Sequence, residues 1–166
     1  TNPSFKNLMM FTSLSKRSNA PGLRSGFVAG DARLIKSFLL YRTYHGGAMS
    51  PMVQMGSVAA WDDETHVVEN RRLYDEKYAL ADEIFASVSE YRSPPGGFFL
   101  WLPVEDGEQA ALKLWTSSGV RVLPGAYLAK EIDGQNPGKS YIRVALVAPK
   151  PEMVRGLTLL RDCLWP

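Results

Sequence analysis

The chain has 166 residues, enough for one ordinary domain with a hydrophobic core, and its 45% hydrophobic and 11% aromatic content excludes a disordered protein. Its 19 basic and 17 acidic residues leave a net charge of +2 and are scattered, which argues against partners such as nucleic acid or an anionic membrane. The single cysteine, Cys163, excludes an internal disulfide and suits a reducing compartment, and no apolar run approaches the roughly 18 residues of a membrane span. The sequence therefore predicts a soluble cytoplasmic protein.

The first part of the chain contains two short apolar runs separated by a segment rich in serine and glycine. Residues 5–12 and 26–29 are predicted to be buried strands. The segment between them, residues 13–26, reads Ser-Leu-Ser-Lys-Arg-Ser-Asn-Ala-Pro-Gly-Leu-Arg-Ser-Gly. Serine and glycine in such numbers indicate a turn or loop. We therefore expect two strands joined by an irregular segment.

Three helices are expected next, over residues 32–44, 51–61 and about 63–88. Their expected N-caps are Asp31, Ser50 and either Asp62 or Asp63. Proline in the first turn suits the second helix. His45-Gly46-Gly47 is expected to end the first, with glycine at a positive φ. The third helix is heavily charged, which predicts a solvated face and a link from a larger domain to a smaller one.

The sequence after residue 96 predicts a compact α+β unit. Its expected elements are a strand over 98–102, a helix over 105–118, strands over 120–123 and 141–147, and a helix over 150–163. A surface loop is expected over residues 133–139, which are rich in glycine, asparagine and proline. The aromatic side chains of the first strand, Phe98, Phe99 and Trp101, are expected mainly in the core, with one ring bordering a bound ligand.

One lysine, Lys16, lies among hydroxyls and glycines between the two strand-like runs. Lysine is seldom buried without a partner, and the neighbouring small residues leave room for a ligand to approach the backbone. Ser13, Ser15 and Arg24 are donors suited to a phosphate. A nucleophilic lysine beside a phosphate site suggests a Schiff base with pyridoxal phosphate. The alternative is a surface turn with a solvated lysine and arginine.

A second cation, Arg143, lies within the apolar strand candidate over residues 141–147. A charge there is costly unless it is paired. The alternative to a ligand-binding role is an arginine on an edge strand that points to water.

The motif around Lys16 resembles the signature of class I/II aminotransferases of fold type I. Ser13-Leu14-Ser15-Lys16 is followed by Gly22-Leu23-Arg24-Ser25-Gly26, which places an arginine eight residues after the lysine. The resemblance extends in order over essentially the whole chain, as the C-terminal part of such an enzyme. Residues 12–19 and 41–46 look most like the succinyldiaminopimelate aminotransferase subfamily.

The resemblance implies an α/β fold that continues upstream. Residues 1–62 are expected to be the C-terminal part of the large cofactor-binding domain, 63–90 a long interdomain helix, and 91–166 a small C-terminal α+β domain. The upstream part would supply further active-site residues, including the acidic group that pairs with the pyridine nitrogen. Because these upstream residues are missing, this chain alone is expected to be inactive. The resemblance also implies a homodimer, in which the turn after the first helix approaches the active site across the dimer interface.

The resemblance also assigns roles to individual residues. Lys16 would be catalytic and would bind the cofactor together with Ser13, Ser15 and Arg24, and its amine would have a pKa lowered by desolvation. Arg143 would bind the α-carboxylate of the substrate. Arg17 could contact a second carboxylate, although an exposed salt bridge is the alternative. No set of residues has the spacing of a metal site, so no metal is expected.

The implied function is amino-group transfer between an amino acid, with glutamate as the donor, and a keto acid. The subfamily resemblance points to a succinylated amino-keto-pimelate in lysine biosynthesis. Two alternatives remain: another fold-type I enzyme using pyridoxal phosphate, such as a lyase, and a non-catalytic aminotransferase-like domain that senses a ligand.

Overall fold

The computed structural model describes residues 5–166, which form two compact units, one up to Arg71 and one from Arg72. The boundary lies within helix α4 (Thr65–Ile84). The division into 1–62, 63–90 and 91–166 stays a prediction, and its first four residues lie outside the described part. Each unit is described by itself.

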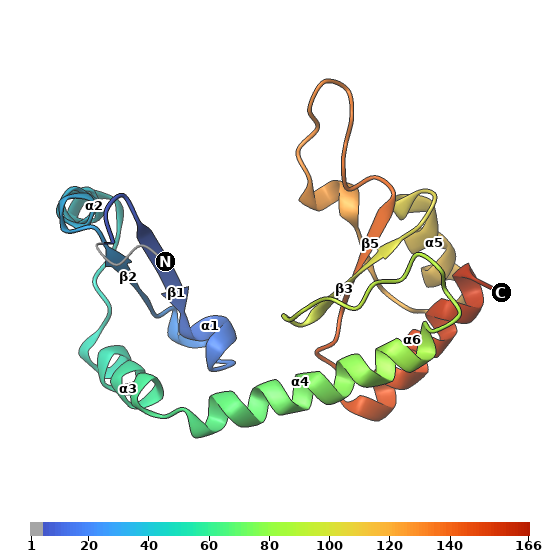
Figure 1. Cartoon of the computed structure of the whole chain (residues 1–166), viewed down its shortest axis with the longest axis horizontal. Helices are drawn as coiled ribbons and strands as arrows, with labels where there is room; N and C mark the ends of the chain where they lie inside the picture. The colour runs from blue at the N-terminus through green and yellow to red at the C-terminus, as the bar shows by residue number, and fades with distance from the viewer. Residues whose placement is uncertain (1–4) are drawn as a thin grey trace. The chain divides into compact units, whose positions relative to one another are not determined.

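The first unit begins with an antiparallel two-stranded ladder. Strand β1 (Met9–Ser13) pairs with β2 (Gly26–Gly30) (Figure 1). In this pairing Ser13 lies opposite Gly26. The short helix α1 (Leu14–Arg17) and the 3₁₀ helix η1 (Pro21–Leu23) lie between the strands. Both strands are confirmed, but their predicted burial is wrong, because a two-stranded ladder does not enclose a core. The side chain of Phe11, for example, is 63% exposed.

Two helices follow the ladder at the predicted places. The Asp31 side chain caps α2 (Ala32–His45) by accepting a bond from Arg33 N at 2.9 Å, and it accepts another from Asn7 N at 2.8 Å. These bonds, the one from Asn7 above all, lower the pKa of Asp31 to about 2. Ser50 caps α3 (Pro51–Asp62). The predicted positive φ after α2 is wrong, because Gly46 has an extended backbone with φ −155° and Gly47 is not among the described glycines with a positive φ.

Helix α4 begins as predicted and ends early. The Asp63 carboxylate accepts bonds from Thr65 N at 3.0 Å and His66 N at 3.3 Å, so it supplies the expected cap. The helix ends at Ile84 instead of near Val88. A tighter turn follows, in which Val88 N donates to Phe85 O, and both side chains are buried in the core.

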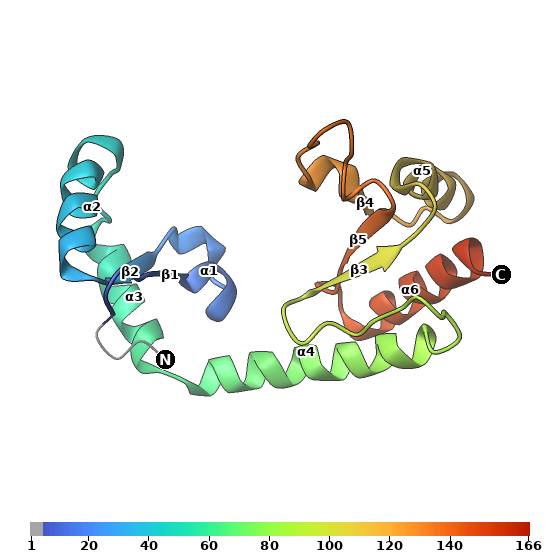
Figure 2. The same ribbon diagram turned by 45° about the horizontal axis from the view of Figure 1, so that its top comes forward.

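The second unit contains a three-stranded antiparallel sheet in the order β3-β5-β4. The strands are β3 (Phe99–Pro103), β4 (Leu123–Pro124) and β5 (Tyr141–Ala145). The helices are α5 (Gly107–Ser118), the 3₁₀ helix η2 (Gly125–Leu128) and α6 (Lys150–Leu164). This order confirms the predicted α+β unit, although β4 shares only Leu123 with the strand predicted over residues 120–123. Helix α6 runs beside the second half of α4 (Figure 2).

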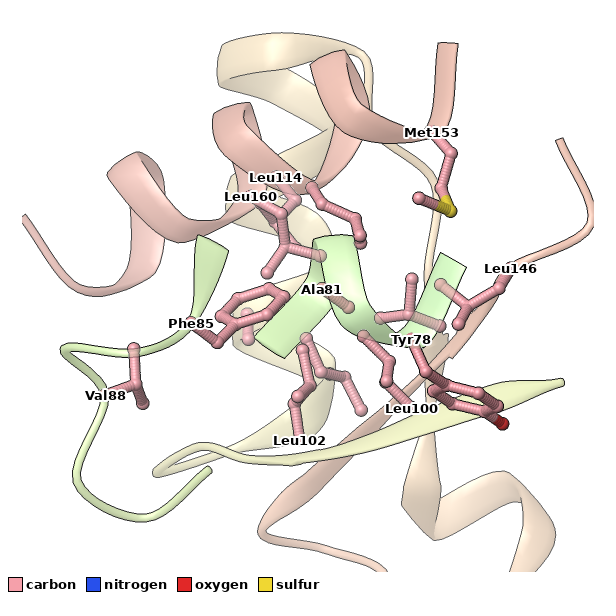
Figure 3. Packing of buried hydrophobic residues seen from close by; sticks show 14 residues of the cluster. Tyr78, Ala81, Phe85, Val88, Leu100, Leu102, Leu114, Leu146, Met153 and Leu160 are labelled. Atoms are coloured by element: carbon pink, nitrogen blue, oxygen red, sulfur yellow. The ribbon is translucent and has the colours of Figure 1, made fainter. Parts of the chain in front are cut away.

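The core of the second unit lies between one face of this sheet and the helices α4, α5 and α6. Leu100 and Leu102 of β3 and Ile142 and Val144 of β5 alternate along their strands and point into it. The helical side is formed by Tyr78, Ala81, Phe85, Val88, Ala110, Leu114, Met153, Leu157 and Leu160, most of which are labelled in Figure 3. The predicted core position of the β3 aromatic residues is therefore wrong, because the leucines between them occupy it.

Truncation of the core is expected to destabilise the second unit. Leu114→Ala removes a fully buried side chain of α5 and should lower the free energy of unfolding by about 3 kcal/mol, since it leaves a cavity. Leu112→Ala on the same helix is the matched control, because Leu112 is 57% exposed. Urea denaturation of the protein that contains this chain measures both. Equal effects would show that Leu114 is not part of a packed core.

The described helices include none that is long and apolar enough to cross a membrane.

Candidate functional site

Ser13 and Ser15 lie together where β1 ends and α1 begins. Ser13 is the N-cap of α1, and its Oγ accepts a bond from Ser15 N at 3.1 Å. The same Oγ lies 3.1 Å from Ser15 Oγ and 3.0 Å from the carbonyl oxygen of Ser25. The two predicted hydroxyl donors are therefore adjacent, and the backbone of the opposite strand fixes one of them.

Lys16 is the residue after Ser15 and lies within α1. The helix is anchored by Leu14, whose side chain is fully buried, while the Lys16 side chain is exposed. The burial expected to desolvate the Lys16 amine is thus not provided by the described residues.

Arg24 lies between η1 and β2 in a left-handed backbone conformation, with φ 50° and ψ 38°. Its side chain is exposed, and its Nη1 donates a bond to the Pro21 carbonyl at 3.2 Å. Within residues 5–166 no carboxylate forms an ion pair with this guanidinium. Its charge is therefore available for an anionic ligand.

The strand pairing brings the serine and arginine segments to the same end of the ladder. Ser13 pairs with Gly26, and Leu14 N donates a bond to Ser25 O at 3.1 Å, one residue after Arg24. Two hydroxyls and a guanidinium are donors that hold a phosphate through charge-assisted hydrogen bonds. The residues present thus fit the phosphate of the expected cofactor, with an amine next to them.

Arg17 has a structural role that resolves its two alternatives. It forms an ion pair with Glu64, donates a bond from Nη1 to Ala60 O at 2.8 Å, and lies 4.7 Å from the ring centroid of Trp61. The salt bridge is confirmed, but the Arg17 side chain is only 16% exposed. Arg17 thus connects α1 to α3. This contact could not be predicted from the sequence around Arg17, because Ala60 is 43 positions away.

Sequence reasoning also missed two buried serines, Ser25 and Ser57. Their Oγ atoms lie 2.7 Å apart, which links α3 to the start of β2. Ser25 stood within the motif, but Ser57 gave no signal, since a serine inside a helix is usually solvated.

Arg143 lies at the middle of the central strand of the second unit. It is opposite Trp101 of β3 and Leu123 of β4, so the edge-strand alternative is wrong. Its neighbours Ile142 and Val144 are buried, which places Arg143 on the face of the sheet away from the core.

Aromatic side chains surround this arginine. Its guanidinium carbon lies 4.4 Å from the centroid of the Phe99 ring, and Trp101 stacks on Tyr141 with centroids 5.3 Å apart. Among the described residues Arg143 has no carboxylate partner. A half-buried guanidinium on an aromatic face can bind a carboxylate through two parallel hydrogen bonds.

The structure brings together four of the five predicted site residues. Ser13, Ser15, Lys16 and Arg24 lie in the first unit, and Arg143 lies in the second. In the part of the chain that the structure describes, no three His, Cys, Asp or Glu side chains are arranged to hold a metal ion.

The chain matches the model of the family described as aminotransferase class I and II over residues 3–158. An aminotransferase of known structure from Neisseria meningitidis is 51% identical, with a TM-score of 0.90 over 97% of this chain and 42% of that chain. The 4-dedimethylamino-4-oxo-anhydrotetracycline transaminase of Streptomyces rimosus is 32% identical over 150 residues, which are 87% of this chain and 39% of that protein. A structure from Thermus thermophilus named a probable N-succinyldiaminopimelate aminotransferase is 26% identical, with a TM-score of 0.81 over 99% of this chain and 44% of that chain.

This chain spans about two fifths of the length of the proteins that it matches. Its fold is accordingly part of the fold of a fold-type I aminotransferase, and members of this class depend on pyridoxal phosphate. With the family model matching nearly the whole chain, this protein belongs to the class I and II aminotransferase family.

Proposed function

We propose that the protein containing this chain is an aminotransferase that uses pyridoxal phosphate. The observation that carries the proposal is the placement of Ser13, Ser15 and Arg24 beside Lys16 at one end of the β1–β2 ladder. When bound, pyridoxal phosphate serves as an electron sink for a negative charge on the substrate carbon.

The residues of the chain divide this work between them. The hydroxyls of Ser13 and Ser15 and the guanidinium of Arg24 bind the phosphate. The Lys16 amine would attach the cofactor and would take and return a proton at the α-carbon of the substrate. Arg143 binds the α-carboxylate of the amino acid or keto acid, and its stacking on Phe99 orients the guanidinium plane.

For the substrates, we propose glutamate as the amino donor and a succinylated amino-keto-pimelate as the acceptor, in lysine biosynthesis in the cytoplasm. The similarity to the Thermus thermophilus protein with that name supports the acceptor. We also propose that the protein works as a homodimer and that its parts are a large domain ending at residue 62, a linking helix over 63–90 and a small domain over 91–166.

One experiment tests the reaction class. The full-length parent protein is expressed and supplied with pyridoxal phosphate, and its visible absorption is followed after addition of glutamate and then of the succinylated keto acid. An aminotransferase converts the cofactor to its amine form with glutamate and back with the keto acid. Absence of a cofactor band would favour the ligand-sensing domain, and repeated turnover with no keto acid added, beyond one product per cofactor, would favour a lyase.

Replacement of Arg24 is expected to weaken cofactor binding. Arg24→Lys keeps the charge but loses the planar pair of donors, so the affinity of the parent protein for pyridoxal phosphate should fall about tenfold, equivalent to one charge-assisted bond. Fluorescence titration of the apoprotein measures the change. Arg92→Lys is the control, because Arg92 is also exposed and also donates only to backbone carbonyls. Equal affinities for the two variants would contradict the phosphate assignment.

A further inference from the structure

Two buried serines connect α3 to the segment that carries the phosphate donors. Ser25 is 3% exposed and Ser57 is 5% exposed, and Asp31 is the one other buried polar or charged residue in the described part of the chain. Burying a hydroxyl is costly unless it is hydrogen-bonded. Ser57 Oγ lies 2.6 Å from the Val53 carbonyl oxygen and 2.7 Å from Ser25 Oγ. Both contacts are satisfied when Ser57 donates to Val53 and accepts the proton of Ser25.

Ser25 in turn holds the first phosphate donor. Its carbonyl oxygen accepts bonds from Leu14 N at 3.1 Å and from Ser13 Oγ at 3.0 Å. The Ser13 hydroxyl has one proton, so it must leave this carbonyl to donate to a phosphate, and the bond from Leu14 N is then the one that holds Ser13 beside Ser25. A shift of the Ser25 backbone would therefore move the Ser13 hydroxyl. The hydrogen bond between the Ser25 and Ser57 hydroxyls opposes such a shift.

Ser25 also borders the second donor, Arg24. A residue other than glycine in the left-handed region costs on the order of 1 kcal/mol, so its neighbours must hold Arg24 at φ 50°. On one side Arg24 N donates to Pro21 O at 3.3 Å. On the other side the restraint is Ser25, whose side chain is fixed to α3 through Ser57.

We propose that Ser57 is a positioning residue for the cofactor phosphate, acting through Ser25 on Ser13 and Arg24. The inference rests on the proposed function, since it assumes that these donors bind a phosphate. It assigns to α3 a role in the site: one buried hydroxyl sets the spacing between the hydroxyl and guanidinium donors.

The test compares two cofactor forms that differ in the phosphate. The full-length apoprotein is titrated with pyridoxal phosphate and, separately, with pyridoxal, which lacks the phosphate. Ser57→Ala is expected to weaken binding of pyridoxal phosphate about tenfold, the effect of one hydrogen bond, and to leave the affinity for pyridoxal unchanged. A general loss of structure would weaken both.

The matched control is Ser37→Ala. Ser37 also lies in a helix and its Oγ donates to the carbonyl four residues earlier, Arg33 O, at 3.3 Å, but its side chain is exposed. Neither affinity should change in this variant.

A second variant breaks the same bond from the other side. Ser25→Ala should produce a similar selective loss, and the double variant should bind no more weakly than the weaker single variant, because the two changes remove one interaction. Equal losses for both ligands, or additive effects, would overturn the positioning role. If the unaltered protein shows no preference for pyridoxal phosphate over pyridoxal, the phosphate site itself is overturned, which separates failure of the proposed function from failure of this inference.

Discussion

Replacement of Lys16 by alanine is expected to abolish amino transfer in the full-length protein. The variant lacks the amine that attaches the cofactor and the group that moves the proton, and a single positioned acid–base group contributes on the order of 10²–10⁴ in rate. We therefore expect a fall in kcat of about 10⁴-fold or more. Single-turnover kinetics with glutamate measure the loss, and the visible spectrum shows whether the cofactor is still attached.

The fold should survive this change. The Lys16 side chain is exposed on α1, so its removal should alter the free energy of unfolding by no more than about 0.5 kcal/mol. Lys36→Ala, another exposed lysine of the first unit, serves as the control and should retain full activity. Activity of Lys16→Ala within a few-fold of the Lys36→Ala protein would remove Lys16 from the reaction.

The candidate phosphate site could be predicted from the sequence because its residues, Ser13, Ser15, Lys16 and Arg24, lie close together along the chain. The motif placed three phosphate donors and an amine within twelve positions, and the turn between two strands brought its two ends together. Local rules were similarly sufficient for the helix starts at Asp31 and Ser50, since an N-cap depends on bonds to backbone amides two or three residues away.

Burial was less predictable, because it depends on what packs against an element. The apolar run that became β1 predicted a buried strand, yet a two-stranded ladder leaves residues such as Phe11 exposed. The alternation in β3 contained both a leucine set and an aromatic set, and the pattern alone did not decide which faces the helices. Contacts over long sequence separations, such as Arg17 with Ala60 or Ser25 with Ser57, leave no local pattern at all.

Replacement of Arg143 by alanine is expected to weaken substrate binding and to leave the cofactor in place. A bidentate bond between arginine and carboxylate is among the stronger protein–ligand contacts, and its loss should lower kcat/KM for glutamate on the order of 100-fold, or about 3 kcal/mol. The affinity for pyridoxal phosphate should be unchanged, since the proposed phosphate donors are Ser13, Ser15 and Arg24 and not Arg143. Steady-state kinetics and cofactor titration of the full-length protein measure the two quantities.

The control for Arg143 is Arg121→Ala, because Arg121 also stacks on an aromatic ring, that of Trp115, at 4.9 Å, but lies outside the β5 strand. An amine substrate that lacks the α-carboxylate adds a second comparison. Its slow turnover should be the same in the unaltered protein and in Arg143→Ala, because this substrate has no carboxylate for the Arg143 guanidinium to bind. A variant that turns over both substrates more slowly by the same factor would show that Arg143 supports the fold of the sheet. Loss of pyridoxal phosphate from the variant would assign Arg143 to the cofactor.

A fall in kcat/KM for the carboxylate substrate alone would establish that Arg143 binds the α-carboxylate. The structure leaves this guanidinium able to do so, since β5 is the central strand and Arg143 has no carboxylate partner among residues 5–166.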